Sequence, residues 1–185
     1  MTAIGLFSRV RATSSSRVRK LLAMAAAVFV GAFLLCESTG IRLNTSPSLP
    51  LGLYIITADA SATLVEFCPA EPFASFSISR GYRDRGACGD GAAPLLKPVI
   101  ASPGDLVDLS ARGISVNGVL LQNTTPLQKD SAGRPLRAWP FGRYAVDENT
   151  IWVASTYQAR SFDSRYFGPV SANLVRHHLK PFLTL

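Results

Sequence analysis

This 185-residue chain has only two histidines, His177 and His178. It also has no Asp or Glu before Glu37. The two histidines are adjacent, lie close to the C-terminus and have no supporting motif. A Ser-His-Asp triad is therefore not favoured, although triads are recognised by geometry and not by order. We interpret both histidines as solvated tail residues. The chain also has no Gly-rich phosphate-binding loop, so no nucleotide cofactor is implied.

The net charge of +7 is concentrated at the N-terminus. Five of the 19 basic residues lie before residue 21, which leaves 14 basic and 12 acidic residues in the rest of the chain. A nucleic-acid-binding domain should carry its positive charge on the folded body, so a nucleic-acid partner is not expected. Basic residues beside an apolar segment are instead typical of membrane orientation. The five are Arg9, Arg11, Arg17, Arg19 and Lys20.

The apolar segment is residues 21–36, which contain no charge. As a helix it would span about 24 Å, slightly less than a hydrocarbon core of about 30 Å, and the long side chains of Arg19 and Lys20 could close the gap. We predict a retained transmembrane anchor, with a cleaved signal peptide as the alternative. Residues 1–20 would then stay cytoplasmic, and residues 37–185 would form an exported domain at a bacterial inner membrane.

Cysteine is also rare, with only Cys36, Cys68 and Cys88. No second Cys or His lies at ligand spacing beside Cys68 or Cys88, so we expect no metal site. Cys36 falls at the membrane boundary and is expected to be inert. In an oxidising compartment Cys68 and Cys88 should form a disulfide, and closing a loop of that size would contribute about 3 kcal/mol.

Short β-prone runs separated by Pro and Gly dominate the exported part, so we predict a mainly β domain of antiparallel sheets. Asn117-Gly118 is a strong hairpin signal. Residues 69–94 look like a long excursion or lid. The tail is predicted to start a short helix at Ser171 that Pro181 stops. The expected strands are residues 51–56, 95–100, 106–109, 114–121, 144–146 and 151–154.

Ser48 is the candidate nucleophile, in the segment Ser46-Pro47-Ser48-Leu49-Pro50. The two prolines restrain the backbone, which would hold the Ser48 hydroxyl and its own N–H in one geometry. That N–H is a natural oxyanion donor, and Ser46 could place its hydroxyl on the same side of an extended segment. The alternative is a Pro/Ser-rich linker after the membrane helix.

Lys97 is the candidate general base, because it lies inside an apolar strand between Pro94-Leu95-Leu96 and Pro98-Val99-Ile100. Burial disfavours the ammonium and lowers the pKa of a lysine, as a base that works near neutral pH requires. The alternatives are an edge-strand lysine that discourages aggregation and a lysine whose stem snorkels to the surface. A Ser-Pro-Gly-Asp turn follows at residues 102–105.

The third segment, Ser161-Phe-Asp-Ser-Arg-Tyr-Phe-Gly-Pro-Val170, is the most specific. With the Ser48 and Lys97 segments in this order, the chain resembles the signal peptidase I superfamily, membrane-anchored serine proteases with a lysine base. The resemblance implies that Ser161 hydrogen-bonds Lys97, that Asp163 and Arg165 pair behind the site, and that Gly168 allows close backbone approach.

Two departures from housekeeping signal peptidases are similar to TraF-type proteases of conjugative transfer. Leu49 stands alone between Ser48 and Pro50, and residues 154–160 replace the usual Gly-Asp-Asn-Arg lead-in. The resemblance implies a precursor substrate such as a propilin of a type IV secretion apparatus, a conjugative transfer partner, no cofactor, and possible cyclisation of the product. The alternatives are a general signal peptidase and a non-catalytic, membrane-tethered β module.

Overall fold

A computed structural model describes residues 14–38 and 40–185 of this chain. The chain divides between Gly40 and Ile41 into two compact units. Helix α1, Ser14–Ser38, is the described element of the first unit and contains the predicted apolar span. No helix in this described part is both long enough and apolar enough to cross a membrane. Arg9 and Arg11, on which the predicted orientation partly depends, lie outside the described residues.

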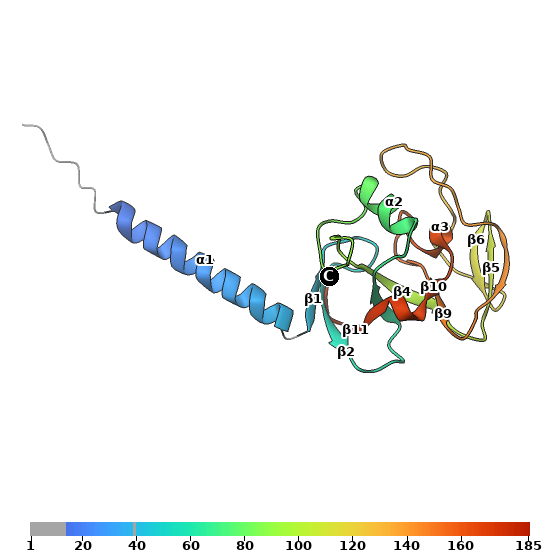
Figure 1. The fold of residues 1–185 in the computed structure, drawn as a ribbon, viewed down its shortest axis with the longest axis horizontal. Helices are drawn as coiled ribbons and strands as arrows, with labels where there is room; N and C mark the ends of the chain where they lie inside the picture. The colour runs from blue at the N-terminus through green and yellow to red at the C-terminus, as the bar shows by residue number, and fades with distance from the viewer. Residues whose placement is uncertain (1–13, 39) are drawn as a thin grey trace, which may run out of the picture. The chain divides into compact units, whose positions relative to one another are not determined.

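The second unit is built from antiparallel strands, as predicted (Figure 1). Its larger sheet has seven strands in the order β1 (Ile41–Asn44), β2 (Gly52–Thr57), β11 (Val175–Thr184), β3 (Leu64–Phe67), β4 (Leu95–Ala101), β9 (Thr150–Val153) and β10 (Val170–Ser171). Its smaller sheet has the order β7 (Val119–Leu120), β6 (Gly113–Val116), β5 (Leu106–Ser110) and β8 (Gly142–Ala145).

The strands expected from apolar runs are found within one or two residues of their predicted bounds. The predicted hairpin joins β6 and β7, with positive φ at Asn117 (51°) and Gly118 (84°). Two positive φ angles suit the two-residue turn that matches strand twist. Strands β1 and β3 were not predicted, because each has only four residues, which is too short for a recognisable hydrophobic pattern.

The prediction for the C-terminal tail is right that a short helix starts at Ser171 and wrong that it extends to Pro181. Only Ala172–Leu174 forms a single 3-10 turn, and the chain then continues as β11 between β2 and β3. Beyond Leu179, β11 pairs with β2 alone, and its register shifts after Pro181. A proline is tolerated where one side of a strand is unpaired or irregular. His177 and His178 are therefore half-buried sheet residues and not solvated tail residues.

The largest core cluster joins β3, β4 and β9 to the segment that carries the third motif. Helix α3, Ser164–Phe167, begins at Asp163, whose side chain caps it by accepting from the Arg165 N–H. Phe162 lies among aromatic rings, stacked on Tyr166 at 5.9 Å and edge-on to Phe167 at 5.3 Å. The motif is thus part of the core, and its polar side chains are held by that packing.

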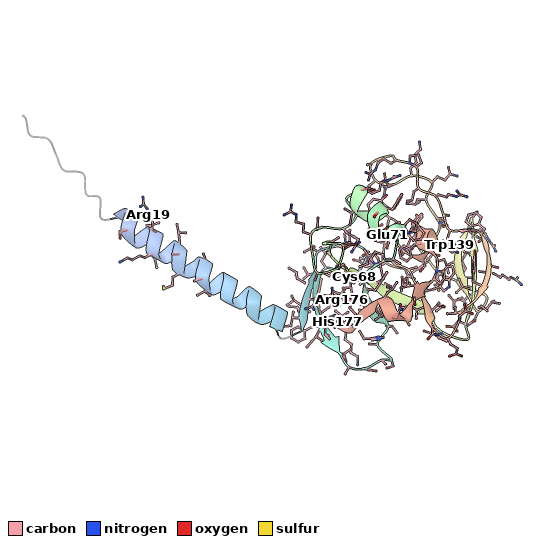
Figure 2. All side chains as sticks on the ribbon, in the orientation of Figure 1. Arg19, Cys68, Glu71, Trp139, Arg176 and His177 are labelled. Carbon is pink, nitrogen blue, oxygen red and sulfur yellow. A yellow bond between two sulfur atoms is a disulfide. The ribbon has the colours of Figure 1, made fainter. Side chains whose placement is uncertain are left out.

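The excursion at residues 69–94 contains helix α2, Phe73–Ser79, and is tied back to the sheet. Cys68, directly after β3, forms the expected disulfide with Cys88. Arg176 of β11 reinforces the tie by donating to the Ala87 carbonyl at 2.7 Å, and Figure 2 shows Arg176 beside Cys68 and His177. The excursion is therefore fixed at its base to two neighbouring strands.

Gly168 ends α3 with φ at +72°, and a Cβ there would lie 2.5 Å from the Trp139 ring. Gly168→Ala should combine a strained backbone with a clash and lower the free energy of unfolding by about 3 kcal/mol. Gly133→Ala is the matched control, because Gly133 also has positive φ (76°) but faces open space. It should cost only about 1 kcal/mol. Urea denaturation of both variants tests this, and equal losses would contradict the close approach.

Candidate active site

The turn that carries Ser48 is fixed by one buried side chain, Asn44 at the end of β1. The Asn44 amide donates to the carbonyls of Ser46 (2.9 Å), Leu49 (3.3 Å) and Pro50 (3.1 Å), and its oxygen accepts from the Ser46 N–H. Tyr54 also donates to the Pro50 carbonyl at 2.7 Å. Sequence reasoning missed the role of Asn44, because a single asparagine carries no motif.

Ser48 itself is buried, with 4% of its surface exposed. Its Oγ lies 3.1 Å from the Ser46 Oγ, and its N–H lies 3.4 Å from the same oxygen. The Ser155 hydroxyl donates to the Ser48 carbonyl at 2.6 Å, across 107 residues of sequence. Ser155 was not predicted as a site residue, although it lies just after β9. The backbone of Ser48 is therefore hydrogen-bonded both at its N–H and at its carbonyl.

Lys97 lies at the centre of β4, which pairs with β3 on one side and with β9 on the other. Its side chain is buried, with 4% of the residue exposed. Burial lowers the pKa of Lys97 to about 8, against a smaller raising effect of Asp163, and Arg165 lowers it further. A substantial fraction of Lys97 is thus neutral near pH 8, as a general base must be.

Asp163 and Arg165 are both fully buried and form an ion pair. The Arg165 Nε lies 2.7 Å from Asp163 Oδ1, and its Nη2 lies 2.8 Å from Oδ2. Burial alone would lower the pKa of Arg165, but the contacts with Asp163 outweigh it and raise that pKa. Asp163 also accepts from the Ser155 N–H at 3.1 Å, which links the pair to the residue that holds Ser48.

Ser161 is placed differently from what the resemblance implied. Its Oγ is buried and has no hydrogen-bond partner among the described residues, so the implied bond to Lys97 is not formed. Ser161 does line the same cavity as Lys97. Its carbonyl accepts from Arg165 at 2.9 Å, which fixes its backbone.

One cavity of about 660 Å³ brings four of the candidate residues together, whereas Asp163 and Arg165 are not among its lining residues. Ser46, Ser48, Lys97 and Ser161 line it, together with residues 80–84 of the excursion and several residues between Leu127 and Leu136. Within the described residues, Ser48 Oγ has Ser46 Oγ as its hydrogen-bond partner and is not bonded to Lys97. Catalytic hydrogen bonds are often long in unliganded enzymes and tighten with substrate.

Histidine chemistry is not supported at this cavity. Neither His177 nor His178 is among its lining residues. In the part of the chain that the structure describes, no three His, Cys, Asp or Glu side chains are grouped so that they could hold a metal ion. A buried serine and a lysine of lowered pKa can instead support nucleophilic acyl transfer, in which the lysine accepts the serine proton.

Comparison with known proteins identifies the family. The family model for signal peptidases, peptidase S26, matches residues 15–180. The chain belongs to this family. The family thus confirms the resemblance drawn from the three motifs and supports a serine peptidase.

Relatives similar to this chain are named as conjugal or plasmid transfer proteins. The plasmid transfer protein TraF of Escherichia coli is 33% identical over 176 residues, which cover 91% of this chain and 99% of that protein. The conjugal transfer protein TraF of Agrobacterium fabrum is 35% identical over 162 residues, covering 85% and 90%. A crystal structure of a signal peptidase I from Enterococcus faecalis is 21% identical with a TM-score of 0.37, and it covers 68% of this chain and 99% of that chain.

The lowered pKa of Lys97 gives stability a definite pH dependence. Because this pKa falls from its ordinary 10.5 to about 8 on folding, the unfolded chain binds more protons between these values, and stability rises with pH across that window. At pH 7 the buried ammonium costs the folded state about 3 kcal/mol.

Lys97→Met should therefore raise the free energy of unfolding at pH 7 by up to about 3 kcal/mol, and this gain should shrink as the pH approaches 10. Urea denaturation of both proteins between pH 7 and pH 10 measures the difference. A constant difference across this range would show that Lys97 keeps its ordinary pKa in the folded protein.

Proposed function

We propose that this protein is a membrane-anchored serine endopeptidase with a Ser48/Lys97 dyad that matures a propilin, or a similar exported precursor, for conjugative transfer. The observation that carries the proposal is the shared cavity, which is lined both by buried Ser48 and by buried Lys97 with a pKa of about 8. Family membership supports the peptidase chemistry, and the names of the relatives support the conjugative role.

In the proposed reaction, Ser48 Oγ attacks the scissile carbonyl while Lys97 Nζ accepts the hydroxyl proton. The tetrahedral oxyanion forms beside the Ser48 N–H and the Ser46 hydroxyl, which lie within 3.4 Å of one another and serve as donors. Lys97 then returns the proton to the leaving amine, and the acyl-enzyme remains on Ser48. Water releases the acyl group as an acid, whereas attack by the precursor's own N-terminal amine would give a cyclic product.

Asp163, Arg165 and Ser161 have supporting roles in this proposal. The neutralised pair of Asp163 and Arg165 fixes the backbone behind Lys97, and the free hydroxyl of Ser161 can accept a bond from Lys97 when substrate shifts the side chain. Residues 80–84 and 93–94 of the excursion line the cavity, so we assign residues 69–94 as its lid.

The proposed location is a bacterial inner membrane, with residues 21–36 as a single anchor, the N-terminus in the cytoplasm and residues 37–185 in the periplasm. The uncharged run in α1 and the basic residues before it support this orientation. The disulfide between Cys68 and Cys88 also supports export, because disulfides persist in oxidising compartments.

Processing of the propilin in cells tests the dyad. Ser48→Ala and Lys97→Ala should each reduce processing by at least about 10³-fold, because a nucleophile and its base act as one unit. Ser61→Ala, which changes an exposed serine, is the matched control and should process normally. Immunoblots of membrane fractions report the precursor, the product and the level of each variant.

Three outcomes separate the alternatives. Uncut propilin with normal levels of both dyad variants supports the proposal. Simultaneous accumulation of secretory preproteins would instead indicate a general signal peptidase. Wild-type processing by Ser48→Ala or Lys97→Ala would rule out the dyad and favour a non-catalytic module of the transfer apparatus.

A further inference from the structure

A surplus of positive charge lies on one side of the Ser48/Lys97 cavity. Four basic side chains line this side, and we call them the basic rim: Arg80, Lys129, Arg134 and Arg160. Two carboxylates, Asp84 and Asp130, line the cavity beside them. The four cationic side chains of the basic rim thus outnumber the two carboxylates beside them.

The other cations of the cavity wall, apart from Lys97, are already paired. Arg42 lies 3.0 Å from Glu66, and Arg83 lies 2.7 Å from Asp90, so each guanidinium has a carboxylate of its own. The surplus charge is therefore confined to the basic rim and is not spread around the cavity.

Two of the rim arginines share one carboxylate. Asp130 accepts from Arg134 Nε at 2.8 Å, from Arg80 Nη1 at 3.3 Å and from the Tyr82 hydroxyl at 2.7 Å. Burial alone would raise the pKa of Asp130, but hydrogen bonds from Tyr82 and Arg134 hold it well below its usual range. Asp130 therefore stays ionised at neutral pH and can balance only one of the two guanidinium charges.

Further contacts hold Arg80 and Arg134 in place. Arg134 Nη2 donates to the Arg80 carbonyl at 2.8 Å, which joins the excursion to the loop at residues 128–136. The Arg80 guanidinium also lies over the Phe76 ring, 4.7 Å from its centre. A guanidinium fixed in this way loses little conformational freedom when it meets a carboxylate.

Lys129 and Arg160 complete the basic rim from its exposed side. Neither forms an ion pair with any residue in the described ranges 14–38 and 40–185, and the guanidinium of Arg160 has only the Ser131 hydroxyl, at 3.4 Å, as a hydrogen-bond partner there. A concave surface with unbalanced positive charge attracts an anionic ligand and orients it.

We propose that the basic rim binds an acidic side chain of the precursor, an Asp or Glu within a few residues of the scissile bond, and that this contact contributes to substrate selection. The proposal rests on the proposed function, because the rim lines the same cavity as Ser48 and Lys97. The shared cavity favours a peptide carboxylate over an anionic lipid headgroup, which would need the rim to face a bilayer.

Peptide binding to the full-length Ser48→Ala protein in detergent tests the proposal without requiring catalysis. The probes are fluorescein-labelled, alanine- and glycine-rich peptides in which a single Glu is moved along the sequence, each with a Gln counterpart. At one or more positions Glu should bind about fivefold more tightly than Gln at low ionic strength, and salt should reduce the difference.

Charge removal then assigns the effect to the rim. In Lys129→Gln/Arg160→Gln the ratio of Glu to Gln affinity should fall to less than half of its original value, measured by fluorescence anisotropy, because only the one unbalanced charge of Arg80 and Arg134 remains. Arg112→Gln is the matched control, because Arg112 is an exposed arginine between β5 and β6, outside the cavity lining, and it should keep the ratio.

Equal affinity for Glu and Gln peptides at every position would overturn the proposal. So would a preference that is undiminished in the double variant or disappears in Arg112→Gln. Rim-dependent binding to phosphatidylglycerol vesicles without any peptide preference would assign the rim to lipid. Cleavage of Glu and Gln peptides by the wild-type protein at equal rates would leave the proposed peptidase intact while removing this inference.

Discussion

The buried ion pair between Asp163 and Arg165 is the contact on which the rest of the site depends. Arg165 donates to the carbonyls of Asn123, Thr125 and Ala159 as well as to Ser161, so one side chain joins segments that share no strand. Asp163 caps α3 and accepts from the Ser155 N–H, and Ser155 holds the carbonyl of Ser48. Removing either charge would leave the other buried without a partner, which is strongly destabilising.

The same pair also modifies the pKa of Lys97, which burial lowers. An unpaired Asp163 would stabilise the ammonium of Lys97 and hold its pKa high. Because Arg165 lies beside the carboxylate, the raising effect of Asp163 is opposed and burial dominates, which gives Lys97 its pKa of about 8. The pair therefore has two roles. It fixes the backbone around Ser48, and it allows Lys97 to be partly neutral near pH 8, so that its amine can accept a proton.

The sequence predicts the local features of this architecture and misses those that depend on long-range pairing. β4 and the Asn117-Gly118 hairpin follow from apolar runs and turn chemistry, because their signals lie within a few residues. β11 was missed because Pro181 indicates a break, and only the position of the strand beside β2 makes that proline acceptable. Asn44 and Ser155 were missed for a similar reason: their partners are carbonyls, and no residue pattern encodes which carbonyl a side chain reaches.

Trapping of the acyl-enzyme tests the central claim, that Ser48 is the nucleophile activated by Lys97. Wild-type protein is mixed with an alanine-peptide ester, quenched in acid, digested and analysed by mass spectrometry. The account predicts the peptide acyl group on the fragment that contains Ser48, with none on Ser48→Ala and a greatly reduced amount on Lys97→Met. An acyl group on another residue, or equal acylation of Lys97→Met, would contradict it.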